Sequence, residues 1–266
     1  MQRPIALDFR DVTCAFGPYV ALDRASLTVA DGEFVSIVGP TGCGKSTLLN
    51  VAAGLLEPTG GTAFSQGEPI GNLNLDAGYM FQSDALMPWR TAIDNIVVGL
   101  EYRGVPRAEA LKRGEAWLTR VGLDSHGHRF PHQMSGGMRK RCALAQVLIM
   151  EPKTLLMDEP FSALDVQTRQ IMENELLDLW SADRKSVLFI THDLEEAISL
   201  SDRVILLSAG PRTRPIGEFI IDLPRPRDVA EIRHTPAFVD LHQRIWAAMR
   251  DEVMKAYARN KERLVS

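Results

Sequence analysis

A glycine-rich segment that ends in lysine and serine carries the strongest chemical signal in this sequence. It fits the spacing G-x-x-x-x-G-K-[ST] at every fixed position. Glycines let the backbone curl so that successive N–H groups point at phosphate oxygens, and the start of a following helix adds partial positive charge. Lys45 is expected to reach the β- and γ-phosphates, and the Ser46 hydroxyl to bind Mg²⁺. The segment predicts a nucleotide site formed by Gly39, Pro40, Thr41, Gly42, Cys43, Gly44, Lys45, Ser46 and Thr47. A plain glycine-rich turn is the weaker alternative, because a strand is expected just before the segment and a helix just after it.

Two adjacent acids end an apolar run later in the chain. Asp158 and Glu159 follow residues 155–157 and precede Pro160. The carboxyl ends of parallel strands meet in the crevice where such sheets bind ligands, so both acids are expected beside the phosphate loop. Asp158 is then the Mg²⁺ partner, directly or through water, and Glu159 polarises an attacking water, a general-base role worth about 10²–10⁴ in rate. A solvated turn before the proline is the alternative reading, which the phosphate loop disfavours.

A histidine ends another apolar run. His192 follows residues 187–191 and precedes Asp193 and two glutamates. A neutral imidazole at the end of a neighbouring strand can hydrogen-bond the γ-phosphate or the attacking water, which makes His192 the third expected catalytic residue after Lys45 and Glu159. An ordinary surface or core histidine is the alternative.

A second segment has the features of a helix start that binds an anion. Ser135 can cap the helix, and Gly136 and Gly137 expose backbone N–H groups. Met138 follows them. A capped helix alone is an ordinary element, but here it stands in a chain that has only one phosphate loop.

The order of phosphate loop, capped helix start, acidic strand end and histidine resembles the ATP-binding subunits of ABC (ATP-binding cassette) transporters over roughly residues 5–222. The resemblance implies that the chain is an ATPase with ATP and Mg²⁺ as cofactors. It also implies that the Ser-Gly-Gly element is the family's signature motif, which contacts the γ-phosphate held by a second copy. Two cassettes would therefore close head to tail around two ATP molecules.

The resemblance also assigns roles to residues outside these motifs. Phe16 would stack on adenine, with Tyr19 as the competing candidate. Gln82 would touch Mg²⁺ and sense the membrane subunit, and the segment 162–165 would be the D-loop that crosses the dimer interface. The signature commonly reads Leu-Ser-Gly-Gly-Gln, so Met138 removes an amide that could bond a ribose.

Three segments resemble the cassettes of the nitrate/sulfonate/taurine importer group: 82–89, 135–139 and 222–227. This resemblance implies a peripheral protein on the cytoplasmic face of the inner membrane that powers uptake of a small, anionic solute. Its partners would be integral membrane permease subunits, docked near residues 82–89, and indirectly a solute-binding protein. An exporter cassette, and a cassette acting on nucleic acid or ribosomes, are the alternatives. The latter is disfavoured by the absence of a long coiled coil or a second cassette and by the net charge of −4.

Hydrophobic patterning predicts the elements that position these residues. The predicted strands cover residues 5–12, 21–29, 34–38, 62–64, 77–81, 154–158, 186–191 and 203–207. The predicted helices cover residues 45–53, closed by Gly54, then 92–103, 107–121, 136–150, 168–180 and 236–258, the last with Phe238, Leu241, Ile245, Ala248 and Val253 on its apolar face. The fold class is therefore α/β: a P-loop NTPase core with a mostly parallel sheet, an N-terminal antiparallel β part and an inserted helical subdomain.

The expected domain organisation is a cassette over residues 1–222, with the helical insert at about 91–150, followed by a linker and a C-terminal amphipathic helix over 223–266. Hydrophobic residues make up 45% of the 266 residues and charged residues 24%, which is typical of an ordinary globular protein. Three cysteines without C-x-x-C spacing argue against a disulfide framework and a thiolate zinc site, and they fit a reducing compartment. No signal-peptide pattern and no run of about 18 apolar residues is present, so membrane attachment is expected through a partner.

Overall fold

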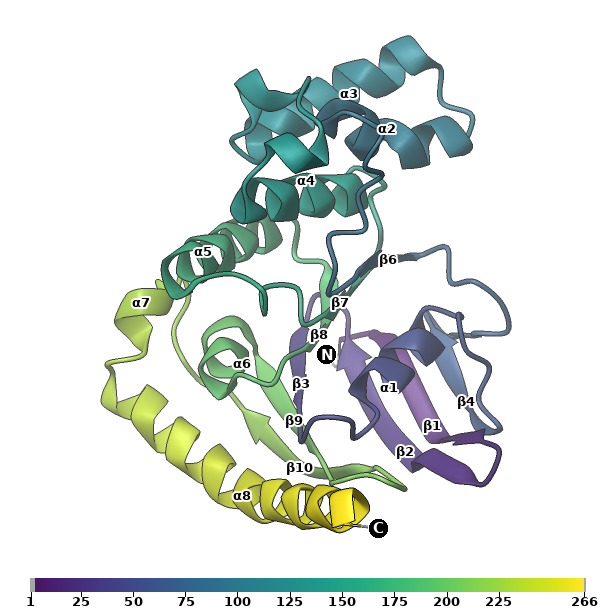
Figure 1. Ribbon diagram of the computed structural model, residues 1–266, viewed down its shortest axis with the longest axis vertical. Coiled ribbons are helices and arrows are strands. Elements are labelled where there is room, and N and C mark those ends of the chain that lie inside the picture. Colours follow the sequence, from purple (N-terminus) through teal and green to yellow (C-terminus); the bar gives the residue numbers. More distant parts are fainter. Residues whose placement is uncertain (1–2, 266) are drawn as a thin grey trace.

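The larger of two sheets carries both the phosphate loop and the acidic pair. The computed structural model describes residues 3–265, with the side chains of 3–259 and 261. The sheet has the order β10-β9-β3-β8-β7-β6, and all its strands except β10 run parallel (Figure 1). Its strands are β3 (Phe34–Val38), β6 (Ala77–Met80), β7 (Thr154–Asp158), β8 (Ser186–Ile190), β9 (Arg203–Leu207) and β10 (Pro215–Ile220). The expected mostly parallel sheet is confirmed.

Helices cover both faces of this sheet, which explains why its strands are continuous apolar runs. Every residue of β3, β8 and β9 is buried. Alternate residues face opposite sides. In β8, Leu188 and Ile190 pack in the same cluster as helix α1 (Lys45–Ala52), whereas Val187 and Phe189 pack in the same cluster as α5 (Val166–Asp183).

Two strands were not predicted, the two-residue β5 (Glu68–Pro69) and the edge strand β10. In β10, half-buried and exposed residues alternate at the edge of the sheet, where it pairs antiparallel with β9. Its sequence, Pro-Ile-Gly-Glu-Phe-Ile, contains a proline and a glycine that hide the alternation. Proline is tolerated there because an edge strand leaves one row of backbone groups unpaired.

The N-terminal antiparallel part is confirmed, with longer strands than expected. Its order is β2-β1-β4-β5, with β1 (Ile5–Phe16), β2 (Tyr19–Ala30), β4 (Gly60–Ser65) and β5 (Glu68–Pro69). Register shifts interrupt the pairing of β1 with β2, and Asp11 has a positive φ of 50°. Each such irregularity flips the side-chain alternation. The predicted strands therefore ended where the alternation changed, although the pairing continues to the Phe16–Tyr19 turn.

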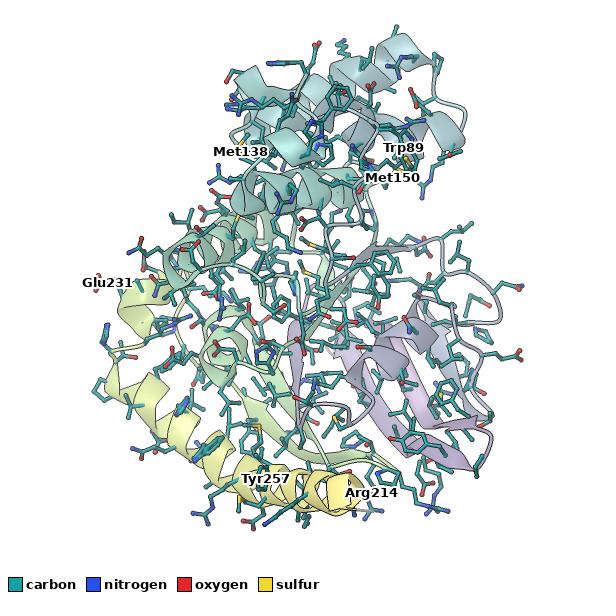
Figure 2. All side chains as sticks on the ribbon, in the orientation of Figure 1. Trp89, Met138, Met150, Arg214, Glu231 and Tyr257 are labelled. Carbon is teal, nitrogen blue, oxygen red and sulfur yellow. The ribbon has the colours of Figure 1, made fainter. Side chains whose placement is uncertain are left out.

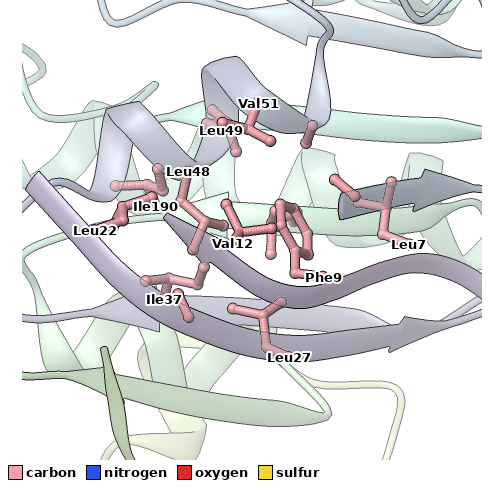
Figure 3. Packing of buried hydrophobic residues seen from close by; sticks show 14 of the residues in the cluster. Leu7, Phe9, Val12, Leu22, Leu27, Ile37, Leu48, Leu49, Val51 and Ile190 are labelled. Carbon is pink, nitrogen blue, oxygen red and sulfur yellow. The ribbon is translucent and has the colours of Figure 1, made fainter. Parts of the chain in front are cut away.

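Helix α1 lies between the two sheets and carries the phosphate loop at its N-terminus. Figure 3 shows Leu48, Leu49 and Val51 of α1 packed against Phe9 of β1 and Ile190 of β8. Burying a leucine side chain fully contributes about 1.5–3 kcal/mol. The phosphate loop is therefore anchored to a helix that packs against both sheets.

The predicted end of α1 is also confirmed. Gly54 has φ of 69°, and a Cβ there would meet the Asn72 backbone oxygen at 1.9 Å. Only glycine fits this position, where the chain leaves the helix in the left-handed conformation.

A block of helices stands between β6 and β7 in the sequence. It contains α2 (Ala92–Tyr102), α3 (Arg107–Arg120) and α4 (Gly136–Leu148), with short 3₁₀ turns at Asp124–His126 and Pro131–Gln133. Figure 1 shows α2 and α3 at the top of the molecule, with α4 between them and the rest. Buried residues from all three helices, including Ile96, Leu118 and Cys142, form one apolar cluster.

The arginine-rich segment after the last strand was expected to be a linker, but its arginines are anchored. Arg227 is 8% exposed and donates to the carbonyls of Ile198, Ser199 and Ser201 at the C-terminus of α6 (Leu194–Leu200). Arginine at this place satisfies helix carbonyls that have no partner within the helix. A short helix, α7 (Val229–Ile232), follows it and was not predicted.

The C-terminal helix α8 (Pro236–Val265) is longer than predicted and uses a slightly different face. Phe238, Leu241 and Ile245 are buried as expected, but Ala248 is exposed and Met249 is buried. The buried face follows the i, i+4 ridge from Ile245 to Met249, because this ridge packs on α6. Among the described residues, no helix is both long enough and apolar enough to span a membrane.

Candidate active site

The ends of three parallel strands bring the predicted chemical residues to one edge of the sheet. β8 pairs with β3 through Ile37 and Ile190, and with β7 through Asp158 and Ile190. The phosphate loop leaves β3 at this edge, Glu159 follows β7, and His192 follows β8. The structure therefore brings together side chains that lie far apart in the sequence, such as Lys45 and His192.

The phosphate loop has the backbone that its glycines predict. Gly42 and Gly44 have φ of 75° and 105°. A Cβ at Gly39 would lie 3.1 Å from the Leu207 backbone oxygen and 3.2 Å from the Cys43 sulfur. Gly42 and Gly44 thus supply a left-handed backbone, and Gly39 allows close packing against β9.

The lysine of the loop is held in place by the loop itself. The Lys45 side chain is buried, and its Nζ donates to the backbone oxygens of Gly39 at 3.0 Å and Pro40 at 3.2 Å. An ammonium group has three donors, so one remains for a phosphate oxygen. The ammonium charge is therefore held within the loop.

The thiol in the loop is structural in this geometry. Cys43 is buried, and burial raises the pKa of its thiol. The charge of Lys45 opposes this effect without cancelling it. Because the thiolate is the reactive form, Cys43 supplies the loop with packing and backbone groups and no nucleophile.

Ser46 and Asp158 lie within hydrogen-bonding reach of each other and offer two oxygen atoms as metal ligands. Burial raises the pKa of the Asp158 carboxyl, a hydrogen bond from Ser46 opposes this, and the charge of Glu159 adds to it. The Tyr79 hydroxyl of β6 donates to Asn50 Oδ1 at 3.1 Å and also lies 3.5 Å from Asp158 Oδ2, so its one hydrogen can serve either acceptor. Oxygen donors of this kind fit Mg²⁺, which needs only one or two protein ligands beside phosphate and water.

Glu159 and His192 are in direct contact. His192 Nδ1 lies 3.0 Å from Glu159 Oε2. Glu159 has φ of 43°, a left-handed conformation that costs a residue with a side chain about 1–2 kcal/mol. Its backbone N–H donates to the Ile190 carbonyl at 2.9 Å, which holds the turn. Non-glycine residues in this conformation often occur at functional sites.

Two aromatic side chains flank the turn between β1 and β2. Phe16 and Tyr19 pair across the turn and are 51% and 37% exposed. Leu22, three residues further along β2, lies so close to Gly44 that a Cβ on this glycine would meet its Cδ2 at 3.3 Å. The strand that begins at Tyr19 thus passes beside the phosphate loop, and both aromatics are exposed enough to stack on a base.

Gln82 follows the strand next to the acidic pair. It is exposed and lies two residues after Met80, which pairs with Met157 of β7. Its backbone oxygen accepts a hydrogen bond from Lys140 Nζ at 2.7 Å. The Gln82 loop is therefore fastened to α4.

The predicted anion-binding helix start lies elsewhere. Ser135 caps α4 and accepts a hydrogen bond from the Met138 N–H at 3.3 Å, as predicted. A Cβ on Gly137 would meet Thr168 Cγ2 at 2.9 Å, which explains why glycine stands there. Figure 1 shows α4 well separated from α1. A single chain therefore does not bring Ser135, Gly136, Gly137 and Met138 to its own phosphate loop.

Several residues of the site have no local sequence signal. Tyr79, Lys140 and Arg169 contact site residues or their loops from other elements. Lys140 and Arg139 both pair with Asp84, at 2.9 and 2.8 Å. For Lys140 the basic Arg-Lys-Arg run directly after the signature segment is a weak signal, and Tyr79 and Arg169 have none.

Two buried carboxyls lie behind the His192 loop. Glu173 is fully buried and pairs with Arg233 at 2.9 Å, and Glu196 is 4% exposed. Burial raises the pKa of Glu173 to about 7 and that of Glu196 to about 8, from 4.5. The folded chain therefore binds more protons than the unfolded chain between about pH 5 and pH 8.

The free energy of unfolding is therefore expected to fall as the pH rises from 5.5 to 8.5. Glu196→Gln should flatten this dependence and raise the melting temperature at pH 8.5, because the amide is neutral at every pH. For a chain near this size, 1 kcal/mol corresponds to roughly 2–4 °C. Calorimetry across this pH range measures the effect. The control is Glu195→Gln, since Glu195 is 51% exposed on the same helix. Equal slopes for the wild type and Glu196→Gln would contradict the assignment.

The sequence and the fold both have known relatives. The family described as ABC transporter matches residues 22–162. An uncharacterized ABC transporter ATP-binding protein of Methanocaldococcus jannaschii is 44% identical over 237 residues, 89% of this chain and 86% of that protein. The nitrate import ATP-binding protein NrtD of Synechococcus elongatus is 40% identical over 229 residues, covering 85% and 83%. The bicarbonate transport ATP-binding protein CmpD of the same species is 41% identical over 228 residues, covering 85% and 82%.

A solved structure has the same architecture. The dimeric post-hydrolysis state of the ATP-binding cassette MJ0796, bound to ADP and phosphate, matches with a TM-score of 0.70 and 30% identity. The match covers 82% of this chain and 100% of that chain.

Proposed function

This chain belongs to the ATP-binding cassettes of ABC transporters, and we propose that it powers the import of a small anionic solute of the nitrate, sulfonate or taurine kind. It is an ATPase of this family. The observation that carries the ATP-hydrolysing part of this proposal is the convergence of Lys45, Asp158, Glu159 and His192 at the carboxyl edge of one parallel sheet. The loop and Lys45 bind the phosphates of ATP.

Ser46 and Asp158, together with Gln82, are the proposed ligands of Mg²⁺. The half-buried Asp158 carboxylate lies beside both the Ser46 hydroxyl and the Glu159 charge, where a cation relieves the repulsion between the two acids. The ion, when bound, neutralises charge on the phosphates. Burial raises the pKa of Asp158, and a nearby cation favours its ionised form.

Glu159 is the proposed general base. Its carboxylate accepts the proton of the attacking water, and His192 holds this carboxylate through Nδ1. In-line phosphoryl transfer needs no covalent enzyme intermediate, because catalysis depends on positioning and charge stabilisation.

A second copy of the chain completes the site in this proposal. The signature segment is separated from its own phosphate loop, so its Ser135 and backbone donors are available to the γ-phosphate of a partner. The MJ0796 cassette forms a dimer in its ADP- and phosphate-bound state. Head-to-tail closure would provide two identical composite sites.

Permease subunits are the proposed membrane partners, and a solute-binding protein is the proposed indirect partner. The chain would then work at the cytoplasmic face of the membrane. Trp89 is 73% exposed, whereas Leu86 packs partly into the apolar clusters beneath it. Figure 2 shows Trp89 at the helical block and Tyr257 on α8 at the opposite end of the molecule. Of the two apolar residues, Trp89 is the one suited to a contact outside the chain.

The names of relatives at about 40% identity support import of an anion over export. NrtD is named for nitrate import and CmpD for bicarbonate transport. The test is a reconstituted complex with its permease in lipid vesicles, with labelled nitrate, an alkyl sulfonate and taurine as probes. ATP on the cassette side should drive one of these three solutes toward that side. Movement in the opposite direction would identify an exporter.

Trp89→Asp is expected to reduce ATP-driven transport in these vesicles by about 10-fold or more, while the isolated chain keeps its ATPase activity. A charge placed in an apolar contact weakens docking strongly. Tyr257→Asp is the matched control, because Tyr257 is 67% exposed and lies far from Trp89. Equal loss of ATPase and transport would point to folding damage and contradict the docking role.

A further inference from the structure

We propose that Arg169 is a positioning residue that ties segment 162–165 to the loop bearing His192, so that the seating of this segment and the alignment of Glu159 with His192 occur together. Arg169 lies in the first turn of α5, directly after the segment. None of the motifs in the sequence includes it. The inference rests on the proposed roles of Glu159 and His192.

The guanidinium group of Arg169 bridges two loops. Its Nη2 donates to the Leu164 carbonyl at 3.1 Å, and its Nη1 contacts Asp193 Oδ2 at 3.3 Å. Leu164 belongs to the segment that follows Glu159, and Asp193 directly follows His192. One planar side chain therefore holds both loops.

The remaining contacts close a ring that passes through the proposed catalytic pair. Ser162 donates its hydroxyl to the Glu159 carbonyl at 2.9 Å, and the Leu164 N–H donates to the Phe161 carbonyl at 3.1 Å. On the other side, Glu159 Oε2 contacts His192 Nδ1 at 3.0 Å. The path from Glu159 through segment 162–165, Arg169 and Asp193 back to His192 is therefore continuous.

Asp193 is itself held firmly. Its Oδ1 accepts from the N–H groups of Glu195 at 2.9 Å and Glu196 at 3.3 Å, so it caps α6. Its own N–H donates to Thr191 Oγ1 at 3.0 Å. The orientation of the His192 backbone is thus fixed by the same residue that Arg169 contacts.

Arg169 lies in a charged pocket that favours arginine over lysine. Its side chain is 23% exposed, and its Nε is buried with no hydrogen-bond partner among the described atoms. The neighbouring acidic groups are Asp193, Glu173 and Glu196. A guanidinium can donate to a carbonyl and a carboxylate at once in fixed geometry, whereas the ammonium of lysine is a flexible point charge.

In the proposed dimer, Arg169 would link the closure of the two copies to the hydrolysis of ATP. Segment 162–165 is the part proposed to cross the interface, so contact with a second copy moves or orders it. Through Arg169 this change reaches Asp193 and the adjacent His192. Hydrolysis would then depend on closure without a direct contact between the partner and the base.

The test compares Arg169→Ala, Arg169→Lys, Asp193→Asn and the combination of Arg169→Ala with Asp193→Asn. We expect Arg169→Ala to lower kcat about 10- to 100-fold, since small misplacements of reacting groups have effects of this size. The Kd for ATP should change less than about 2-fold, because the phosphate loop is untouched. Arg169→Lys should recover part of kcat, and Asp193→Asn keeps the helix cap but loses the charge.

The double variant should be no slower than the slower single variant if both residues act through one contact. Arg141→Ala is the matched control, because Arg141 joins α4 to α5 through Glu175 with similar exposure and touches neither loop. Parallel loss of kcat, ATP affinity and melting temperature would show a merely structural role and overturn the proposal. So would an Arg169→Ala kcat within about 2-fold of wild type. If Glu159→Gln itself turns over normally, the proposed catalytic roles fail instead.

Discussion

Glu159→Gln is expected to bind ATP and hydrolyse it about 10²–10⁴-fold more slowly than the wild type. The amide keeps the shape of the side chain and a contact with His192, but it does not accept a proton from water. ATP therefore persists between the two copies, and the variant should accumulate as an ATP-bound dimer. Phosphate release measures the first effect, and light scattering with size-exclusion chromatography in ATP measures the second.

Glu151→Gln is the matched control for this variant. Glu151 also has a left-handed backbone, with φ of 54° against 43° for Glu159, but its side chain is 75% exposed and pairs with Arg113. The control should hydrolyse ATP at the wild-type rate. A Glu159→Gln variant that stays monomeric with ATP would count against the closed pair, and one that retains turnover would remove Glu159 from the site.

Lys45→Ala is expected to weaken ATP binding about 100-fold or more. A charged hydrogen bond to phosphate contributes about 1.5–3 kcal/mol, and the long-range attraction of a buried ammonium adds to it. The variant also loses the contacts that Lys45 makes with Gly39 and Pro40, so the loop itself loosens. Titration calorimetry with ATP measures the affinity.

The control for Lys45→Ala is Lys153→Ala. Lys153 is 60% exposed at the amino end of β7, opposite the phosphate loop, and pairs with Asp76. This variant should bind ATP as the wild type does. Unchanged affinity in Lys45→Ala would refute the phosphate-loop assignment, provided that both variants melt near the wild-type temperature.

The parts of the fold that sequence patterns predict are those set by local chemistry. The phosphate loop is specified by eight consecutive residues, and the Gly54 helix end by a single backbone conformation. The parallel strands are visible because burial on both faces makes them apolar throughout. The juxtaposition of Glu159 with His192 follows from strand order alone, since each residue stands just after its strand.

What the sequence does not reveal depends on contacts between distant segments. In the sequence Arg227 looks like a charged residue of a solvated linker. Only the fold shows that it donates to carbonyls at the end of α6. Tyr79 and Arg169 occupy ordinary positions in a strand and a helix, and only packing gives them partners. The alternation in β1 breaks at a bulge, which no local pattern reports.

The burial of Arg227 has a mechanical consequence for α8. Arg227 donates to carbonyls at the end of α6, and Leu194 and Ile198 of α6 share an apolar core with Ile245 and Met249 of α8, so the two helices are packed together. His192 lies just before α6, and it lines one groove together with Trp246 of α8. A change in how α8 packs on α6 is therefore expected to reach the surroundings of His192 through side chains that share this core and groove.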